Sequence, residues 1–157
     1  MRAASAMLLV LLMSACAFAQ PGRITTYQFE KKEGGHTARV VFRTRVFARA
    51  RHRSAAVVRG QTKVDGRPAI GTDGNMPAVE IASMRFYLDA KEIKVPGRLY
   101  ADCFDPKFGD DYVTLEFGRG SRDVIISMSG SDGAGGYQVI WRLRKNGRHT
   151  RSINLGG

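Results

Sequence analysis

Arginines spaced two residues apart have the clearest chemical potential in this sequence. From Ala38 to Arg51 the even-numbered positions are apolar except for Thr44, and five odd-numbered positions are basic: Arg39, Arg43, Arg45, Arg49 and Arg51. A guanidinium binds phosphate, sulfate or carboxylate through two parallel N–H groups, so this row is suited to an anionic partner. The other interpretation is that the arginines are only the solvated face of an exposed strand, where charge opposes edge-to-edge aggregation.

A second basic cluster is expected in a C-terminal hairpin. Asn146-Gly147 between two extended segments predicts a two-residue type I′ turn, in which Lys145 pairs with Arg148. Counting outward from that pair places Arg142 opposite Arg151 and Arg144 opposite His149, on one face of the hairpin. The three added candidates for anion binding are therefore Arg142, Arg144 and Arg151. The other face is apolar and is predicted to lie in the core: Tyr137, Val139, Trp141 and Leu143.

The charge of the chain is segregated along the sequence. The formal net charge is +11, and the stretch from Gly34 to Val64 holds eight basic residues and no acidic one. Five more unopposed basic residues follow Gly133, whereas residues 73–123 contain ten acids and seven bases. This pattern predicts a basic surface and an opposed acidic one, if the basic strands lie together in the fold.

No catalytic constellation, metal site or cofactor is predicted. His36, His52 and His149 are far apart in sequence and lack zinc-ligand spacing. His149, flanked by arginines, is expected to be neutral and at the surface. The glycine-rich loop 130–136 precedes a strand, so it is expected to be a tight connection rather than a phosphate loop, which requires a following helix.

Aspartates are concentrated in one predicted loop and carry the alternative chemistry. Paired carboxylates bind calcium or serve as acid and base, and a solvated loop is the simpler interpretation. The loop holds Asp102, Asp105, Asp110 and Asp111, and Asp132 of the glycine-rich loop is a fifth candidate for this role.

The first residues are typical of a secretory signal. Arg2 precedes an apolar run from Met7 to Met13, and Ala17-Phe18-Ala19 is a small-x-small cleavage site, which predicts a cleaved signal peptide over residues 1–19. Alternatively, Met13-Ser14-Ala15-Cys16 is an imperfect lipobox that would make the protein an envelope lipoprotein acylated at Cys16. Both interpretations predict a secreted or periplasmic protein.

The remaining residues, 20–157, are predicted to form a single β-rich domain. Strands are expected over 24–30, 38–51, 55–64, 79–88, 93–95, 99–103, 112–117 and 123–128, with a four-residue loop at 89–92 and the hairpin at the end. We therefore predict one antiparallel β-sandwich or barrel of about nine strands. Cys103, the one cysteine of this domain, is expected to be a buried and inert thiol.

Three functions are compatible with these patterns. The first is a secreted or envelope-associated, non-catalytic binding module that holds an anionic polysaccharide, lipid headgroup or nucleic acid on its arginine-rich strand face. The second is a structural component of the envelope that self-associates through its basic and acidic parts. The third is a small hydrolase or calcium-dependent carbohydrate-binding domain that uses the aspartate loop. No specific protein partner is predicted.

Overall fold

The computed structural model describes residues 23–118, 123–130 and 136–155. The predicted signal peptide, Cys16, Asp132 and most of the glycine-rich loop lie outside these residues. The described part is nearly all β-structure, as predicted, with two short 3-10 turns, η1 (Arg49–Arg51) and η2 (Gly97–Leu99). It contains no helix long and apolar enough to cross a membrane.

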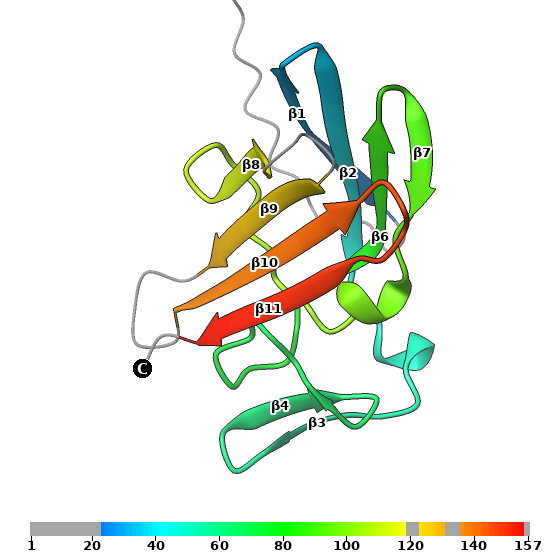
Figure 1. The fold of residues 1–157 in the computed structure, drawn as a ribbon. Helices are drawn as coiled ribbons and strands as arrows, with labels where there is room; N and C mark the ends of the chain where they lie inside the picture. Colours follow the sequence, from blue (N-terminus) through cyan, green and yellow to red (C-terminus); the bar gives the residue numbers. More distant parts are fainter. Residues whose placement is uncertain (1–22, 119–122, 131–135, 156–157) are drawn as a thin grey trace, which may run out of the picture.

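The strands form three antiparallel sheets (Figure 1). Sheet I has the order β1 (Ile24–Glu33), β2 (His36–Val46), β6 (Val79–Leu88) and β7 (Lys91–Lys94). Sheet II has the order β11 (Thr150–Leu155), β10 (Tyr137–Arg144), β9 (Asp123–Gly130) and β8 (Val113–Phe117). Sheet III is small and consists of β3 (Ala55–Val58), β4 (Gln61–Val64) and β5 (Arg67–Pro68).

Sheets I and II share one hydrophobic core, and sheet III lies at one end of the molecule (Figure 1). Alternating residues of β2 and β6, among them Phe42 and Phe86, are fully buried against the alternating residues of β9 and β10. The rings of Phe42 and Trp141 lie 5.8 Å apart across the two sheets, and Trp141 Nε1 donates to the Leu99 carbonyl at 2.6 Å. The predicted apolar face of the C-terminal hairpin is confirmed as part of this core.

The strand predicted over residues 38–51 ends earlier, at Val46. Between Arg43 and Thr44 the pairing with β6 shifts by one residue, because Ala82 is an extra residue on β6. Beyond Val46, Phe47 donates its N–H to Ala78 and the chain enters η1. Period-two alternation alone could not reveal this end, because it is set by the non-local contact with residue 78.

The register predicted for the C-terminal hairpin is wrong by one residue. Arg142 pairs with Thr150 and Trp141 with Arg151, instead of Arg142 with Arg151. β10 ends at Arg144 and β11 begins at Thr150, so residues 145–149 connect the two strands; within them Gly147 has φ +78° and donates its N–H to the Arg144 carbonyl. A shift of one residue moves every side chain of a strand to its other face. Arg151 therefore lies beside Trp141 rather than beside Arg142.

Two other hairpin turns, each with positive φ at two consecutive residues, differ from the predicted strands and loops. The predicted strand 55–64 is the hairpin β3–β4, which turns at Arg59 (φ +50°) and Gly60 (φ +75°). The loop between β6 and β7 has two residues, Asp89 (φ +49°) and Ala90 (φ +65°), instead of four. Arginine and alanine are rare at such positions, so neither turn has a strong local signal. With β5 as well, the described residues contain eleven strands rather than about nine.

The segment 99–103 is a turn rather than a strand, except for a single bridge between Cys103 and Ile70. The Cys103 side chain is fully buried and its thiol is free, as expected. Burial and the neighbouring Asp102 raise the pKa of this thiol to about 12, so it carries no thiolate at neutral pH.

Replacing Ala90 by glycine should stabilise the protein. A non-glycine residue at positive φ costs about 1–2 kcal/mol, whereas the greater freedom of glycine in the unfolded chain costs about 0.4–1 kcal/mol. We expect Ala90→Gly to raise the free energy of unfolding by about 0.5–1 kcal/mol in urea denaturation. Ala56→Gly, at an exposed strand position, is the control and should be destabilising; a loss of stability in Ala90→Gly would contradict the assignment of this turn.

Candidate functional site

The five predicted arginines of residues 39–51 do not form one continuous row. Arg39, Arg43 and Arg45 alternate with the buried residues of β2 and so lie on the face of sheet I that points away from the core. Arg49 and Arg51 follow in η1, where the alternation has ended. Because β2 lies between β1 and β6, this face belongs to a central strand and does not protect a sheet edge.

The first part of the row joins basic residues of β6 and β7. Val41 pairs with Arg85, and Arg85 pairs with Lys94 on the same face. We call the set Arg39, Arg43, Arg85 and Lys94 the outer basic face. It spans three neighbouring strands, and the sequence could not reveal it because Arg85 and Lys94 lie in a net acidic part of the chain.

Two acids accompany the outer basic face. Glu92 lies 3.7 Å from Arg85, and Glu30 lies 3.2 Å from Lys32. Among the described residues, Arg43 and Lys94 have no carboxylate partner. The Arg39 guanidinium lies 4.3 Å from the ring centre of Tyr87, a contact that holds a guanidinium plane while leaving its N–H edges able to donate.

The second part of the row is engaged with a buried carboxylate. Glu80 is only 4% exposed and pairs directly with Arg45 across the two strands. Arg45 Nε donates to Oε1 of Glu80, and Arg51 Nη1 lies 3.8 Å from the same oxygen. A buried carboxylate needs such compensation because desolvation of an unpaired charge is very costly. Arg45 and Arg51 therefore neutralise the protein's own acid.

His52 lies between two carboxylates. Its Nε2 is 2.6 Å from Glu80 Oε2 and its Nδ1 is 3.0 Å from Asp65 Oδ2, while its ring stacks on Phe47 at 4.8 Å. Burial lowers the pKa of His52, but the hydrogen bonds and charges of Asp65 and Glu80 outweigh it and hold the pKa above its ordinary value. Only the imidazolium can donate to both acids. We call Arg45, Glu80, His52 and Asp65 the carboxylate–histidine network.

The network links sheet III to sheet I. Asp65 lies in the turn after β4, and its Oδ1 accepts the N–H groups of Arg53 at 2.7 Å and Ser54 at 3.3 Å. The hydrogen bond from His52 and these backbone bonds lower the pKa of Asp65. Both ring nitrogens of His52 are occupied, so neither is available to take a proton from a substrate. The arrangement is a structural cross-link.

The C-terminal arginines are also paired with acids. Arg142 and Arg144 share Asp123, at 3.3 Å and 3.5 Å from its Oδ2. Arg151 forms a bidentate salt bridge with Asp102, in which Nη2 and Oδ2 are 2.9 Å apart. It also donates a hydrogen bond to the Leu99 carbonyl. The predicted cluster of these three arginines with His149 on one face is therefore wrong, because of the register shift.

His149 is buried rather than on the surface. It is 7% exposed, its Nδ1 accepts the Arg144 N–H at 3.0 Å, and its Nε2 donates to the Lys94 carbonyl at 3.0 Å. Burial lowers the pKa of His149, so the ring is neutral, as predicted. It fixes the C-terminal turn against the end of β7.

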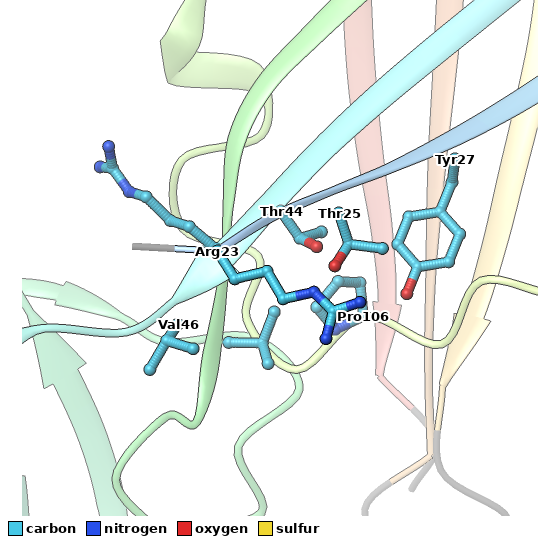
Figure 2. A pocket seen from close by; sticks show the side chains of 8 residues that line it. Arg23, Thr25, Tyr27, Thr44, Val46 and Pro106 are labelled. Carbon is cyan, nitrogen blue, oxygen red and sulfur yellow. The ribbon is translucent and has the colours of Figure 1, made fainter. Parts of the chain in front are cut away.

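A groove of about 360 Å³ opens at the end of sheet I (Figure 2). Thr25 and Tyr27 of β1 line it together with Thr44 of β2, and Pro106 faces them from a loop (Figure 2). Thr44 is the polar exception in the apolar alternation of β2, which was the only signal of this groove in the sequence. The hydroxyls of Thr25, Tyr27 and Thr44 in this groove can each donate and accept hydrogen bonds.

The predicted aspartate cluster does not converge. Asp102 is held by Arg151, and Asp105 Oδ1 accepts the N–H groups of Ala78 and Val79 at 2.9 Å and 2.7 Å. Asp110 and Asp111 are exposed on the following turn. Across the described ranges, no group of three or more His, Cys, Asp and Glu residues is arranged to hold a metal ion.

Comparison with known proteins identifies no family for this chain. No protein-family model, curated protein or solved structure is significantly similar to it. Its function therefore has to be inferred from the geometry described above.

The carboxylate–histidine network predicts a pH dependence of stability. The pKa of His52 is higher in the folded protein than in the unfolded chain. Its contribution to the free energy of unfolding is therefore fully present below the unfolded pKa of about 6.5, and it is lost as the pH rises through the folded pKa. We expect the melting temperature of the wild type, relative to that of His52→Gln, to fall as the pH rises through that window. A difference that stays constant with pH would show that His52 is not charged in the fold.

Proposed function

We propose that residues 20–157 form an exported, non-catalytic binding module of the β-sandwich type, which holds an anionic polymer on the outer basic face. The single observation that carries this proposal is the position of Arg39, Arg43, Arg85 and Lys94 on three adjacent strands, with Arg43 and Lys94 lacking an acidic partner in the described part of the chain.

The contrast with the other basic residues supports this choice of surface. Arg45, Arg51, Arg142, Arg144 and Arg151 all lie against carboxylates of the same molecule. A ligand would have to compete with those internal acids, whereas at Arg43 and Lys94 it displaces only water and counterions. Neighbouring strands are about 4.8 Å apart, so the face presents cations close enough together to hold adjacent charges of one polymer.

The state of the histidines supports a non-catalytic role. Both nitrogens of His52 and both of His149 are engaged in hydrogen bonds inside the protein, and His36 Nδ1 lies 2.9 Å from Asp89. Of the candidate aspartates within the described residues, Asp102 and Asp105 are held by other partners and Asp110 and Asp111 are exposed on a turn. The geometry therefore favours binding over acid–base chemistry.

The outer basic face predicts a specific change in salt-dependent retention. We expect the variant Arg43→Gln, Arg85→Gln, Lys94→Gln to elute from a heparin column at much lower salt than the wild type. Each lost contact means that one counterion fewer is released when the protein binds, which weakens binding. The matched control loses three exposed charges elsewhere: Lys31→Gln, Arg98→Gln and Arg148→Gln. If both variants shift equally, retention reflects net charge alone and this face is not a binding site.

A further inference from the structure

The β3–β4 hairpin exposes two adjacent aliphatic side chains. Val57 and Val58 are 45% and 51% exposed at the end of β3, immediately before the turn at Arg59 and Gly60. Single exposed aliphatic residues are common on soluble proteins and need no explanation. Because successive residues of a strand point to opposite faces, Val57 and Val58 expose aliphatic surface on both faces of the hairpin beside its turn.

Two further exposed apolar residues lie near this turn. Thr62 Oγ1 donates to the Asn75 carbonyl at 2.7 Å, which places the next residue, Met76 (41% exposed), beside the hairpin. Leu155 (72% exposed) ends β11 and lines the same pocket of about 200 Å³ as Gly60. Figure 1 shows the end of β11 and sheet III at the same end of the molecule. We call Val57, Val58, Met76 and Leu155 the apolar tip.

Exposed basic side chains accompany the β3–β4 hairpin. Arg59 lies in its turn and Lys63 on β4, while Arg53 and Arg67 lie at its base, near the Ala55–Val64 pair. Asp65 is the one acid between residues 53 and 67, and its carboxylate is bound by His52 and two backbone N–H groups. Asp73, which lines the neighbouring pocket, is a second acid at this end. The balance at the tip remains positive.

This combination fits the surface of an anionic bilayer. Aliphatic side chains gain free energy by entering the boundary between headgroups and acyl chains, while arginine and lysine remain at the level of the phosphates. An anionic polysaccharide would use the charges but not the valines. A second copy of the chain would cover the valines but would bring like charge against like charge.

We propose that the apolar tip docks the protein onto bilayers that contain anionic phospholipids, with Val57 and Val58 inserted and Arg59 and Lys63 at the phosphates. The hairpin is rigid enough to do so, because Ala55 and Val64 at its base pack with Phe104 in a small core of their own. The carboxylate–histidine network fixes the same base to sheet I. Docking uses residues separate from the outer basic face, so it stands or fails independently of the function proposed above.

Vesicle sedimentation tests the docking surface. The chain starting at Gln20 retains every described residue and should sediment with phosphatidylglycerol–phosphatidylcholine vesicles but not with pure phosphatidylcholine. We expect Val57→Asn, Val58→Asn to lower partitioning by roughly tenfold, and Arg59→Gln, Lys63→Gln to lower it by roughly thirtyfold. The control is Ile24→Asn, which removes an exposed aliphatic side chain (46% exposed) from β1, far from the tip in sequence; this substitution should not change partitioning.

Insertion itself can be followed with a fluorescent label. Val58→Cys carrying an environment-sensitive nitrobenzoxadiazole group should shift to the blue with anionic vesicles, and the same label on Thr114→Cys in β8 should not; the buried Cys103 does not compete for the label. Sedimentation without a shift at residue 58 would overturn the proposal in favour of purely electrostatic binding. Self-association without vesicles that the valine substitutions abolish would overturn it in favour of a dimer interface.

The two proposals separate cleanly in these assays. The valine variant should keep the heparin retention of the wild type, and the Arg43, Arg85, Lys94 variant should keep the blue shift at residue 58. If instead the valine variant lost heparin retention to the same extent as vesicle binding, the tip would be part of the polymer site and membrane docking would be refuted.

Discussion

A buried carboxylate on β6 is the constraint on which much of this structure depends. Glu80 is nearly inaccessible to solvent, and it must therefore be compensated by cations brought to it. Arg45 reaches it from the adjacent strand, whereas Arg51 and His52 reach it from the segment that follows β2. For those two residues to arrive, β2 must end at Val46 and the chain must turn. His52 then continues to Asp65, so the compensation of one acid also determines where sheet III is attached.

The same constraint divides the many arginines of this chain into two classes. Some are internal partners of buried or half-buried acids, as with Arg45 and Glu80 or Arg151 and Asp102, and their removal would leave a carboxylate uncompensated. Others, such as Arg43 on sheet I and Arg59 on sheet III, form no ion pair with an acid among the described residues and are exposed to solvent. A strongly basic sequence therefore does not yield one basic surface. Its exposed cations include the outer basic face and those of the β3–β4 hairpin, and these two groups differ in whether exposed apolar side chains accompany the charge.

Features that depend on local sequence patterns were predictable from the sequence, whereas features that depend on contacts between distant segments were not. The all-β class and the apolar face of β10 came from period-two alternation, a local signal, and the structure confirms both. The position of Arg151 depended on the length of one connection: residues 145–149 join the strands in place of a two-residue turn, and the register shift of one residue directs the Arg151 side chain to Asp102. The end of β2, the bulge at Ala82 and the pairing of Arg85 with Lys94 beside Val41 depend on contacts between distant segments, which no local pattern encodes. The presence of arginines on the outer face of a sheet was therefore predictable from the sequence, whereas the residues that make up the outer basic face were predictable only in part.

Cys103 has a consequence for the fate of unfolded molecules. In the native fold its thiol is buried beside Arg151 and Asp102 and is protonated, so it is inert towards oxidants and other thiols. Unfolding would expose it with an ordinary pKa, and in an oxidising compartment two such chains could join through a disulfide, because the domain offers no second cysteine for an internal one. A covalent dimer would therefore mark molecules that have unfolded, because only they expose the Cys103 thiol.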